Sequence, residues 1–257
     1  MALIHLNCHS DALKMAVNVD VILPQATATQ IGMDGKREAT YRTLYLLHGL
    51  SDDQTIWQRR TSVERYAARY GVAVVMPSGG RSFYTDMRHG EAYYTYIARE
   101  LPALCRSFFA GMSAAPADQF IAGLSMGGYG AWKIGMREGN FAGVASFSGA
   151  LDVHALAGRG NLDDRRYWED IFGDIDAIPG SQEDVYALTE GMIASGKPMP
   201  RLYLSCGTED WLLPATRRMR DLLAAHAVPC EYREAPGNHN WEFWDAELER
   251  MMHYFFA

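Results

Sequence analysis

The chain has 257 residues, of which 48% are hydrophobic and 21% are charged. These are ordinary values for a folded globular protein, so they exclude a disordered or low-complexity chain. The formal net charge of −7 argues against a nucleic-acid-binding surface, which would normally need a basic excess. No apolar run approaches the roughly 18 residues of a membrane span. No secretory leader is expected either, because residues 1–10 lack a basic start followed by an apolar stretch.

The four cysteines are scattered and form no C-x-x-C pair, which predicts free thiols in a reducing compartment, the cytoplasm. The sequence contains no H-E-x-x-H motif, no cluster of Cys and His at ligand spacing, and no glycine loop of a nucleotide-binding protein after its first strand. We therefore expect no metal and no cofactor. The four scattered cysteines are Cys8, Cys105, Cys206 and Cys230.

Short apolar runs alternate with amphipathic stretches along the chain. Strands that are apolar throughout and alternate with helices indicate a parallel sheet covered on both faces, with the active site at the carboxyl ends of its strands. In chain order we expect strands at 17–23 and 40–47, a helix at 60–70, a strand at 72–76, a helix at 92–109, a strand at 120–124, a helix at 126–137, strands at 143–147 and 202–206, a helix at 215–226, a strand at 231–234 and a helix at 242–256.

One stretch breaks this alternation. Residues 152–200 contain Gly and Pro, lack a clear strand and show short helical patterns such as 183–192. We interpret this stretch as an insertion that forms a small cap over the sheet. The expected organisation is a single domain over residues 1–257 that carries this insertion.

The pattern G-x-S-x-G occupies residues 123–127, directly after an expected strand and before an expected helix. This is the context in which the motif exposes a serine nucleophile on a sharp turn. Gly123 and Gly127 suit that turn because a Cβ at either position would clash. The helix beginning at Met126 directs backbone N–H groups toward the same place. Ser125 is therefore the candidate nucleophile; the alternative is a serine in a tight glycine turn without chemistry.

A serine hydroxyl is a weak nucleophile and needs a general base. His239 lies in the polar loop 237–240, after the last short strand, and so is expected on the same rim of the sheet as Ser125. It is the candidate base. The other histidines fit this role less well: His226 and His253 lie in helices, His5 and His9 precede the first expected strand, and His89 and His154 lie in loops without a strand end beside them.

The acid that orients the base is expected at the end of an earlier strand. Asp210 follows the strand at 202–206 and could hold the tautomer of His239 and stabilise its charged form. Glu209 is adjacent, and Asp152 follows the preceding strand, so both remain alternatives. Asp210 could instead cap the helix that begins nearby.

The segment 48–50 follows the strand at 40–47, where this type of fold takes one donor of its oxyanion hole. The backbone N–H groups of Leu50 and Met126 are the expected pair. Gly49 allows the backbone to approach the substrate closely. We expect His48 to hold this loop by hydrogen bonding and not to act as a second base. The alternative is a structural turn without a catalytic part.

Several aromatic residues fall in or near loops at the expected catalytic rim, where they would suit an acyl chain of a few carbons. Burial in the core is the alternative for each, since aromatic residues are common in any core. The candidates for contact with substrate are Trp57, Phe83, Tyr84, Trp211 and Trp241, with Trp244 nearby.

Four segments together resemble the esterase D family, most closely its short-chain branch of tributyrin and acetyl esterases. That resemblance implies an α/β-hydrolase fold and cofactor-free hydrolysis of short acyl esters. It places the nucleophile, acid and base on Ser125, Asp210 and His239, and the oxyanion donors on Leu50 and Met126. It also implies a small acyl pocket and self-association into a homo-oligomer. The segments are 46–52 (LLHGLSD), 80–86 (GRSFYTD), 123–130 (GLSMGGYG) and 237–241 (GNHNW).

The sequence therefore predicts a cytoplasmic serine carboxylesterase that forms an acyl-enzyme from acetyl to butyryl or hexanoyl esters. Its expected partner is a small-molecule ester, with no nucleic acid and no membrane. The alternatives are a thioesterase similar to the S-formylglutathione hydrolases, an acyltransferase, and a binding module without turnover. The sister branch of S-formylglutathione hydrolases usually carries Tyr-Asp before the histidine, whereas Gly237 and Asn238 precede His239 here, which argues against the thioesterase.

Overall fold

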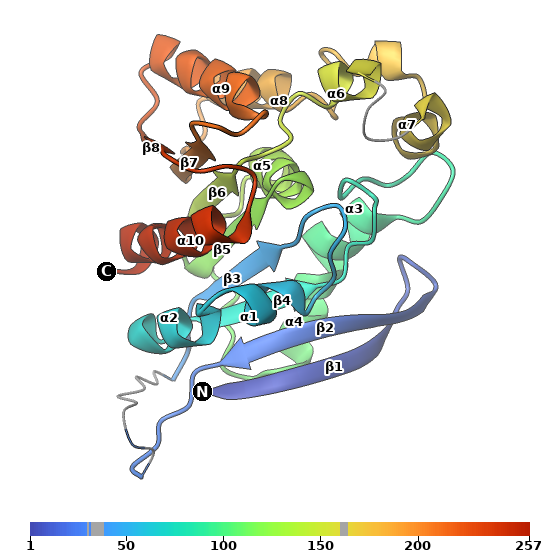
Figure 1. Ribbon diagram of the computed structural model, residues 1–257. Coiled ribbons are helices and arrows are strands. Elements are labelled where there is room, and N and C mark those ends of the chain that lie inside the picture. Colours follow the sequence, from blue (N-terminus) through green and yellow to red (C-terminus); the bar gives the residue numbers. More distant parts are fainter. Residues whose placement is uncertain (30, 32–38, 160–163) are drawn as a thin grey trace.

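An eight-stranded sheet forms the centre of the computed structural model, which describes residues 1–29, 31, 39–159 and 164–257 (Figure 1). The strands lie in the order β1-β2-β4-β3-β5-β6-β7-β8. β2 pairs antiparallel with β1 and β4, and the pairs from β4 to β8 are parallel. The predicted mostly parallel sheet is confirmed. The strands are β1 (Ala2–Ser10), β2 (Met15–Leu23), β3 (Thr43–Leu47), β4 (Ala73–Pro77), β5 (Gln119–Leu124), β6 (Gly143–Phe147), β7 (Arg201–Gly207) and β8 (Cys230–Ala235).

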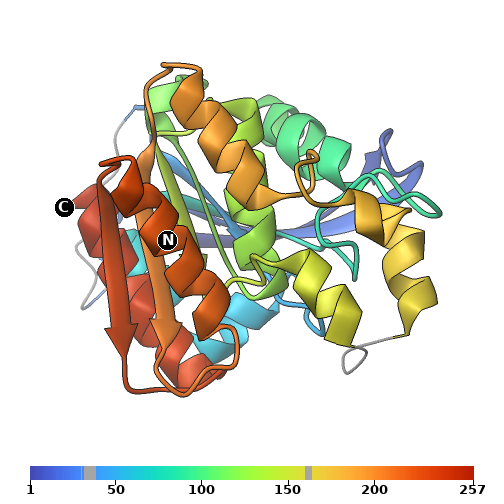
Figure 2. The same ribbon diagram turned by 90° about the horizontal axis from the view of Figure 1, so that it is seen from above.

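Helices cover both faces of the sheet (Figure 2). One face packs against α1 (Ile56–Arg60), α2 (Val63–Tyr70) and α10 (Trp241–Phe256). The other packs against α5 (Met126–Glu138), α8 (Val185–Ala194), α9 (Leu213–Ala225) and a helical stretch made of α3 (Tyr93–Thr95), a π-helix (Tyr96–Glu100) and α4 (Leu101–Phe108).

Successive residues of the central strands enter opposite cores. In β3, Leu44 and Leu46 pack with α1, α2 and α10, while Tyr45 and Leu47 pack with α5 and its neighbours. This is the two-residue period of a strand. Because both faces are buried, the central strands are apolar throughout, which is why their sequence predicted a covered parallel sheet.

The predicted strand at 17–23 was expected to be the first, which is wrong. β1 precedes it and pairs with β2 along the whole length of both strands. One face of β1 is exposed, so its apolar and polar residues alternate instead of forming a continuous apolar run. His5 and His9 lie on this exposed face, and His5 Nδ1 is 2.8 Å from Asp20 Oδ1 on β2.

The predicted single helix at 60–70 is also wrong, because two helices meet there. The backbone of Thr61 is extended, which ends α1. Thr61 Oγ1 donates to the carbonyl of Trp57 and accepts from the N–H of Val63, and the N–H of Ser62 donates to Asp245 Oδ1 at 3.0 Å. These bonds satisfy the backbone groups that the break leaves unpaired.

The segment between β6 and β7 contains the stretch expected as an insertion. Apart from residues 160–163, which lie outside the described residues, it shows helices and no strand. The helices are α6 (Val153–Arg159), α7 (Arg165–Phe172), a 3-10 helix (Ile175–Ala177) and α8. Figure 1 shows α6 and α7 close together at one end of the molecule. Within the described residues, no helix is long and apolar enough to cross a bilayer.

Two helix glycines give a stability prediction. A Cβ on Gly135 of α5 would lie 2.4 Å from Val144 Cγ2 on β6, whereas a Cβ on Gly191 of α8 would meet nothing within 4 Å. Gly135→Ala should destabilise the protein by about 1–3 kcal/mol through overpacking. Gly191→Ala should stabilise it by about 0.5–1 kcal/mol, because alanine is the better helix former. Urea unfolding of both variants tests this; equal effects would contradict it.

Candidate active site

Ser125 occupies the sharp turn between β5 and α5. Its backbone is left-handed, with φ 53° and ψ −117°. Such a conformation in a residue other than glycine costs about 1–3 kcal/mol, so the surroundings must hold it. The N–H of Ser125 donates to Phe147 O at 3.0 Å, and its carbonyl accepts from the N–H groups of Tyr129 at 3.1 Å and Ala150 at 3.0 Å. The turn is therefore fixed to β6 and to the first turn of α5.

The glycines of the motif are required by close backbone contacts, as the sequence predicted. A Cβ on Gly123 would lie 2.3 Å from Gly127 O. A Cβ on Gly127 would lie 2.4 Å from Leu47 O and 2.6 Å from His48 O. In each case the obstacle is backbone that cannot move aside, so any larger residue would open the turn.

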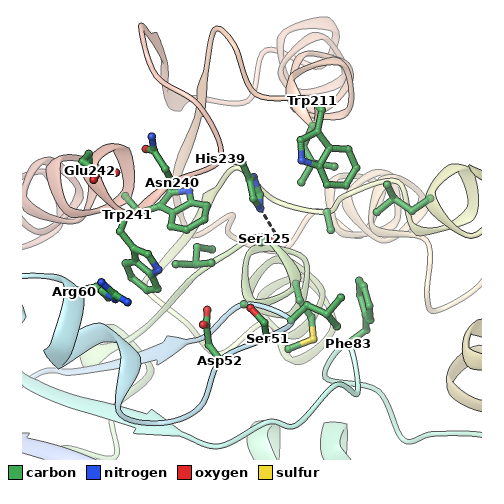
Figure 3. Close-up of a pocket in the computed structure, with 18 residues that line it drawn as sticks. Ser51, Asp52, Arg60, Phe83, Ser125, Trp211, His239, Asn240, Trp241 and Glu242 are labelled. Carbon is green, nitrogen blue, oxygen red and sulfur yellow. Dashed lines mark hydrogen bonds between the residues drawn. The ribbon is translucent and has the colours of Figure 1, made fainter. Parts of the chain in front are cut away.

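Ser125, His239 and Asp210 lie in one line of hydrogen bonds. Figure 3 shows the one between His239 and Ser125. His239 Nε2 is 3.1 Å from Ser125 Oγ, and His239 Nδ1 is 2.8 Å from Asp210 Oδ2. Asp210 follows β7, and His239 follows β8 just before α10. Asn240 Oδ1 caps α10 by accepting from the N–H of Phe243. The structure thus brings together the three residues that the sequence placed at separate strand ends.

The carboxyl group of Asp210 is held in its ionised form. Burial raises its pKa, but hydrogen bonds from His239, from the N–H of Leu212 and from the Ser148 hydroxyl outweigh burial, and its pKa lies below the usual range. The carboxylate accepts from Nδ1 of His239. Nε2 is then the atom that can accept the proton of Ser125.

The two alternative acids are engaged elsewhere. Glu209 Oε2 accepts from the N–H of Gly237 at 2.6 Å, and Asp152 pairs with Arg218 at 2.9 Å. Asp210 also supports the entry to α9, because its Oδ1 accepts from the N–H of Leu212 at 2.9 Å. Its two oxygens therefore serve the helix and the histidine together.

The loop after β3 passes beside Ser125. A Cβ on Gly49 would lie 3.8 Å from Ser125 Cβ. Leu50, from this loop, and Met126, at the start of α5, both line the pocket around Ser125. Their backbone N–H groups therefore belong to the two segments that flank the serine.

His48 holds this loop, which confirms its predicted hydrogen-bonding role. Its Nε2 accepts from the N–H of Gly79 at 2.8 Å, so Nδ1 carries the proton and donates to Gly49 O at 2.7 Å. Burial lowers the pKa of His48, which keeps the ring neutral and this arrangement intact. A sequence motif does not reveal such a clamp, because its partners are backbone atoms of two separate loops.

A pocket of about 650 Å³ opens over Ser125 and His239. Figure 3 shows Phe83 and Trp211 on one side of Ser125, and Trp241 with Arg60 on the other. We call the side with Phe83 and Trp211 the apolar side, and the side with Trp241, Arg60, Asp52, Asn240 and Glu242 the polar side. Met126, Ala150, Leu156 and Leu212 also line the pocket. Phe83, Trp211 and Trp241 were predicted from the sequence to contact substrate, whereas Asp52 and Arg60 were not.

Trp57 and Tyr84, predicted to contact substrate, do not line the pocket. Both side chains are completely buried. Trp57 Nε1 donates to Leu47 O at 3.2 Å, and the Tyr84 hydroxyl donates to His48 O at 2.9 Å. The prediction for these two residues is corrected: their hydrogen bonds support the end of β3 and the loop that follows it. Trp244, which the sequence placed near these candidates, does line the pocket. Its Nε1 donates to Ser148 Oγ at 3.1 Å, a hydrogen bond that gave no signal in the sequence.

Within the part of the chain that the structure describes, no three His, Cys, Asp or Glu side chains gather where they could hold a metal ion.

A mostly parallel sheet with a serine on a strand–helix turn, and with a histidine and an aspartate at later strand ends, defines the α/β-hydrolase fold. The model of the Esterase family, described as "Putative esterase", matches residues 10–255, and the chain belongs to this family.

Three known proteins are similar to this chain over most of their own length. An acetyl esterase from Caldicellulosiruptor saccharolyticus is 32% identical over 252 residues, which cover 95% of this chain and 94% of that protein. Two Staphylococcus aureus structures are each 34% identical and cover 100% of this chain. One is the fluorophosphonate-binding serine hydrolase FphF with substrate bound (98% of that chain, TM-score 0.89), and the other is the S-formylglutathione hydrolase FrmB (99%, TM-score 0.87). The protein is thus a hydrolase of the serine esterase class.

The lowered pKa of Asp210 predicts a dependence of stability on pH. The pKa in the folded state lies below the value of about 3.9 for an unfolded aspartate, so the ionised carboxylate stabilises the fold above that pH. This stabilisation is lost as the pH falls through the folded-state pKa. We expect the wild type to exceed Asp210→Asn in free energy of unfolding at pH 6, and the difference to shrink toward pH 3. Urea unfolding across this range measures it.

The exposed Asp11 provides the control. Asp11→Asn should leave the free energy of unfolding close to that of the wild type at each pH. If the difference in free energy of unfolding between the wild type and Asp210→Asn stays constant from pH 6 to pH 3, the lowered pKa of Asp210 would be contradicted.

Proposed function

We propose that the protein is a serine carboxylesterase that hydrolyses short acyl esters, from acetyl to butyryl or hexanoyl, through an acyl-enzyme. The observation that supports this most strongly is the hydrogen-bonded line from Ser125 Oγ through His239 to Asp210. Within the family, the proposal places the chain in the short-chain branch of esterase D, with the tributyrin and acetyl esterases. Its acetyl esterase relative agrees with that choice.

The reaction begins when Ser125 Oγ attacks the ester carbonyl and its proton passes to His239 Nε2. The backbone N–H groups of Leu50 and Met126 stabilise the oxyanion, and one such donor often contributes about 3–4 kcal/mol. His239 then protonates the leaving alcohol as the tetrahedral intermediate collapses. A water molecule, deprotonated by His239, hydrolyses the acyl-enzyme. Asp210 remains ionised throughout and stabilises the charged imidazole.

The two sides of the pocket suit the two parts of an ester. The apolar side, with Phe83 and Trp211, suits a short acyl chain. The polar side, with Trp241, Asp52 and Arg60, suits an alcohol that carries hydrogen-bonding groups. Burial raises the pKa of Asp52.

The proposal also covers organisation and location. We treat the chain as one domain with residues 152–200 as its insertion, because buried residues of α6, α7 and α8 join the core that α5 forms with the sheet. The four free cysteines suit the cytoplasm. Self-association into a homo-oligomer is proposed on the family resemblance alone.

A series of p-nitrophenyl esters from acetate to laurate tests the acyl specificity. We expect kcat/KM to fall steeply beyond about four to six carbons, because the resemblance to short-chain esterases implies a small acyl pocket. Ser125→Ala should lower kcat by several orders of magnitude, since it removes the nucleophile. A maximum at long chains would indicate an open lipase-like groove, and substantial activity in Ser125→Ala would exclude Ser125 as the nucleophile.

A thioesterase is the second candidate, favoured by the similarity to the S-formylglutathione hydrolase FrmB. The polar side of the pocket carries two carboxylates, Asp52 and Glu242, and one guanidinium, Arg60. Glutathione carries two carboxylates and one ammonium group, so it and this side of the pocket both have a net negative charge and would repel each other. We therefore expect kcat/KM for S-formylglutathione to be at least tenfold below that for an acetyl ester.

Asp52→Asn sharpens this comparison. Removal of one negative charge should raise kcat/KM for S-formylglutathione. The effect on kcat/KM for p-nitrophenyl acetate should be much smaller, because the leaving group of that ester is uncharged before release. A wild type that prefers S-formylglutathione would select the thioesterase instead.

A further inference from the structure

A buried lysine on the helix of the nucleophile has no part in the proposed reaction. Lys133 lies eight residues beyond Ser125 on α5, and its side chain has no exposed surface. Burial lowers its pKa, and the carboxylate of Glu183 opposes that effect. Because burying a charged group costs free energy, its hydrogen-bond partners indicate what it holds in place.

The amine of Lys133 joins three segments of the chain. Nζ lies 2.7 Å from Glu183 Oε2, 2.5 Å from Thr85 Oγ1 and 3.4 Å from Phe83 O. Glu183 comes just before α8, between β6 and β7, whereas Phe83 and Thr85 belong to the loop after β4. Glu183 is further held by the Tyr129 hydroxyl, which donates to its carbonyl at 2.8 Å.

The segment that Lys133 contacts has a backbone that needs support. Phe83 and Tyr84 both have left-handed φ angles, 50° and 51°, which bulky residues rarely adopt. The Phe83 carbonyl faces the Lys133 amine, and the Tyr84 hydroxyl is bonded to His48 O. The hydrogen bonds from Lys133 and Tyr84 therefore act on successive residues of one strained turn.

The strained turn places Phe83 in the wall of the pocket. The Phe83 ring lies 5.1 Å from the ring of Trp168 and 5.9 Å from that of Phe172, both on α7. It also packs edge-on against Tyr129 of α5, at 5.9 Å. Figure 3 shows Phe83 across Ser125 from Trp241, on the apolar side of the pocket. A shift of its backbone would therefore deepen or open that side.

We propose that Lys133 and Glu183 are positioning residues that set the limit on acyl-chain length, because together they lock Phe83 into the pocket wall. This inference rests on the proposed esterase function. Neither residue touches the substrate. The pair acts through the Phe83 carbonyl and Thr85, and it makes the depth of the acyl side depend on the segment between β6 and β7.

Lys133→Met tests the inference, because methionine fills a similar volume without donating a hydrogen bond. We expect the ratio of kcat/KM for p-nitrophenyl hexanoate to that for p-nitrophenyl acetate to rise at least fivefold, mainly through a lower KM for the hexanoate. Trp132→Phe is the matched control. Trp132 is the neighbouring buried residue on α5, and its Nε1 donates to Thr189 Oγ1 of α8 at 2.9 Å. It should leave the ratio within twofold of the wild type.

Glu183→Gln provides a second variant, which keeps the shape of the side chain and removes its charge. We expect it to raise the ratio two- to threefold, and it decides the matter if Lys133→Met does not fold. If Lys133→Met folds, an unchanged ratio in that variant would overturn the inference. If Lys133→Met does not fold, an unchanged ratio in Glu183→Gln would overturn it. An equal rise in Trp132→Phe would also overturn it, because general loosening would then explain the change. A wild type that hydrolyses no ester would instead contradict the proposed function.

Discussion

The turn at Ser125 is the constraint on which the rest of the site depends. A left-handed serine between β5 and α5 is unfavourable, and close backbone contacts keep it in place. The space at Gly127 that a side chain would need is filled by the carbonyls of Leu47 and His48, so α5 is pressed against the end of β3. The same contact brings the loop that carries Leu50 beside the serine. The strain of the nucleophile and the approach of the oxyanion loop are therefore two results of one packing arrangement.

The acid and the base reach the serine from the far edge of the sheet. The space at Gly207, where β7 ends, is filled by the carbonyl of Gly237 after β8, at 2.2 Å from the position of a Cβ. The adjacent Glu209 then bonds the N–H of Gly237. Two neighbouring acids thus divide the work: Glu209 joins the loops after β7 and β8, and Asp210 orients His239 between them. This joining keeps the distance between acid and base short.

Much of this arrangement could be predicted from the sequence, because it follows from local rules. Apolar runs located the central strands, and the glycines around Ser125 indicated the turn. β1 was not predicted, because its one exposed face gives an alternating pattern and not a continuous apolar run. Trp57 and Tyr84 were assigned to the pocket because a sequence places a residue in a loop but does not give the direction of its side chain. The clamp of His48 was expected only in outline, since one of its partners, the N–H of Gly79, belongs to a distant loop.

The reactive groups and the wall of the pocket therefore depend on different kinds of interaction. Strand ends position Ser125, Asp210 and His239, and this requires only the sheet and its short loops. The Phe83 turn lies several residues beyond the end of β4, and side-chain hydrogen bonds hold its left-handed backbone. A hydrogen bond has a direction, so the amine of buried Lys133 can favour one orientation of the Phe83 carbonyl over others. The cost of burying that charge is offset by Glu183, which ties the shape of the pocket to a segment distant in sequence.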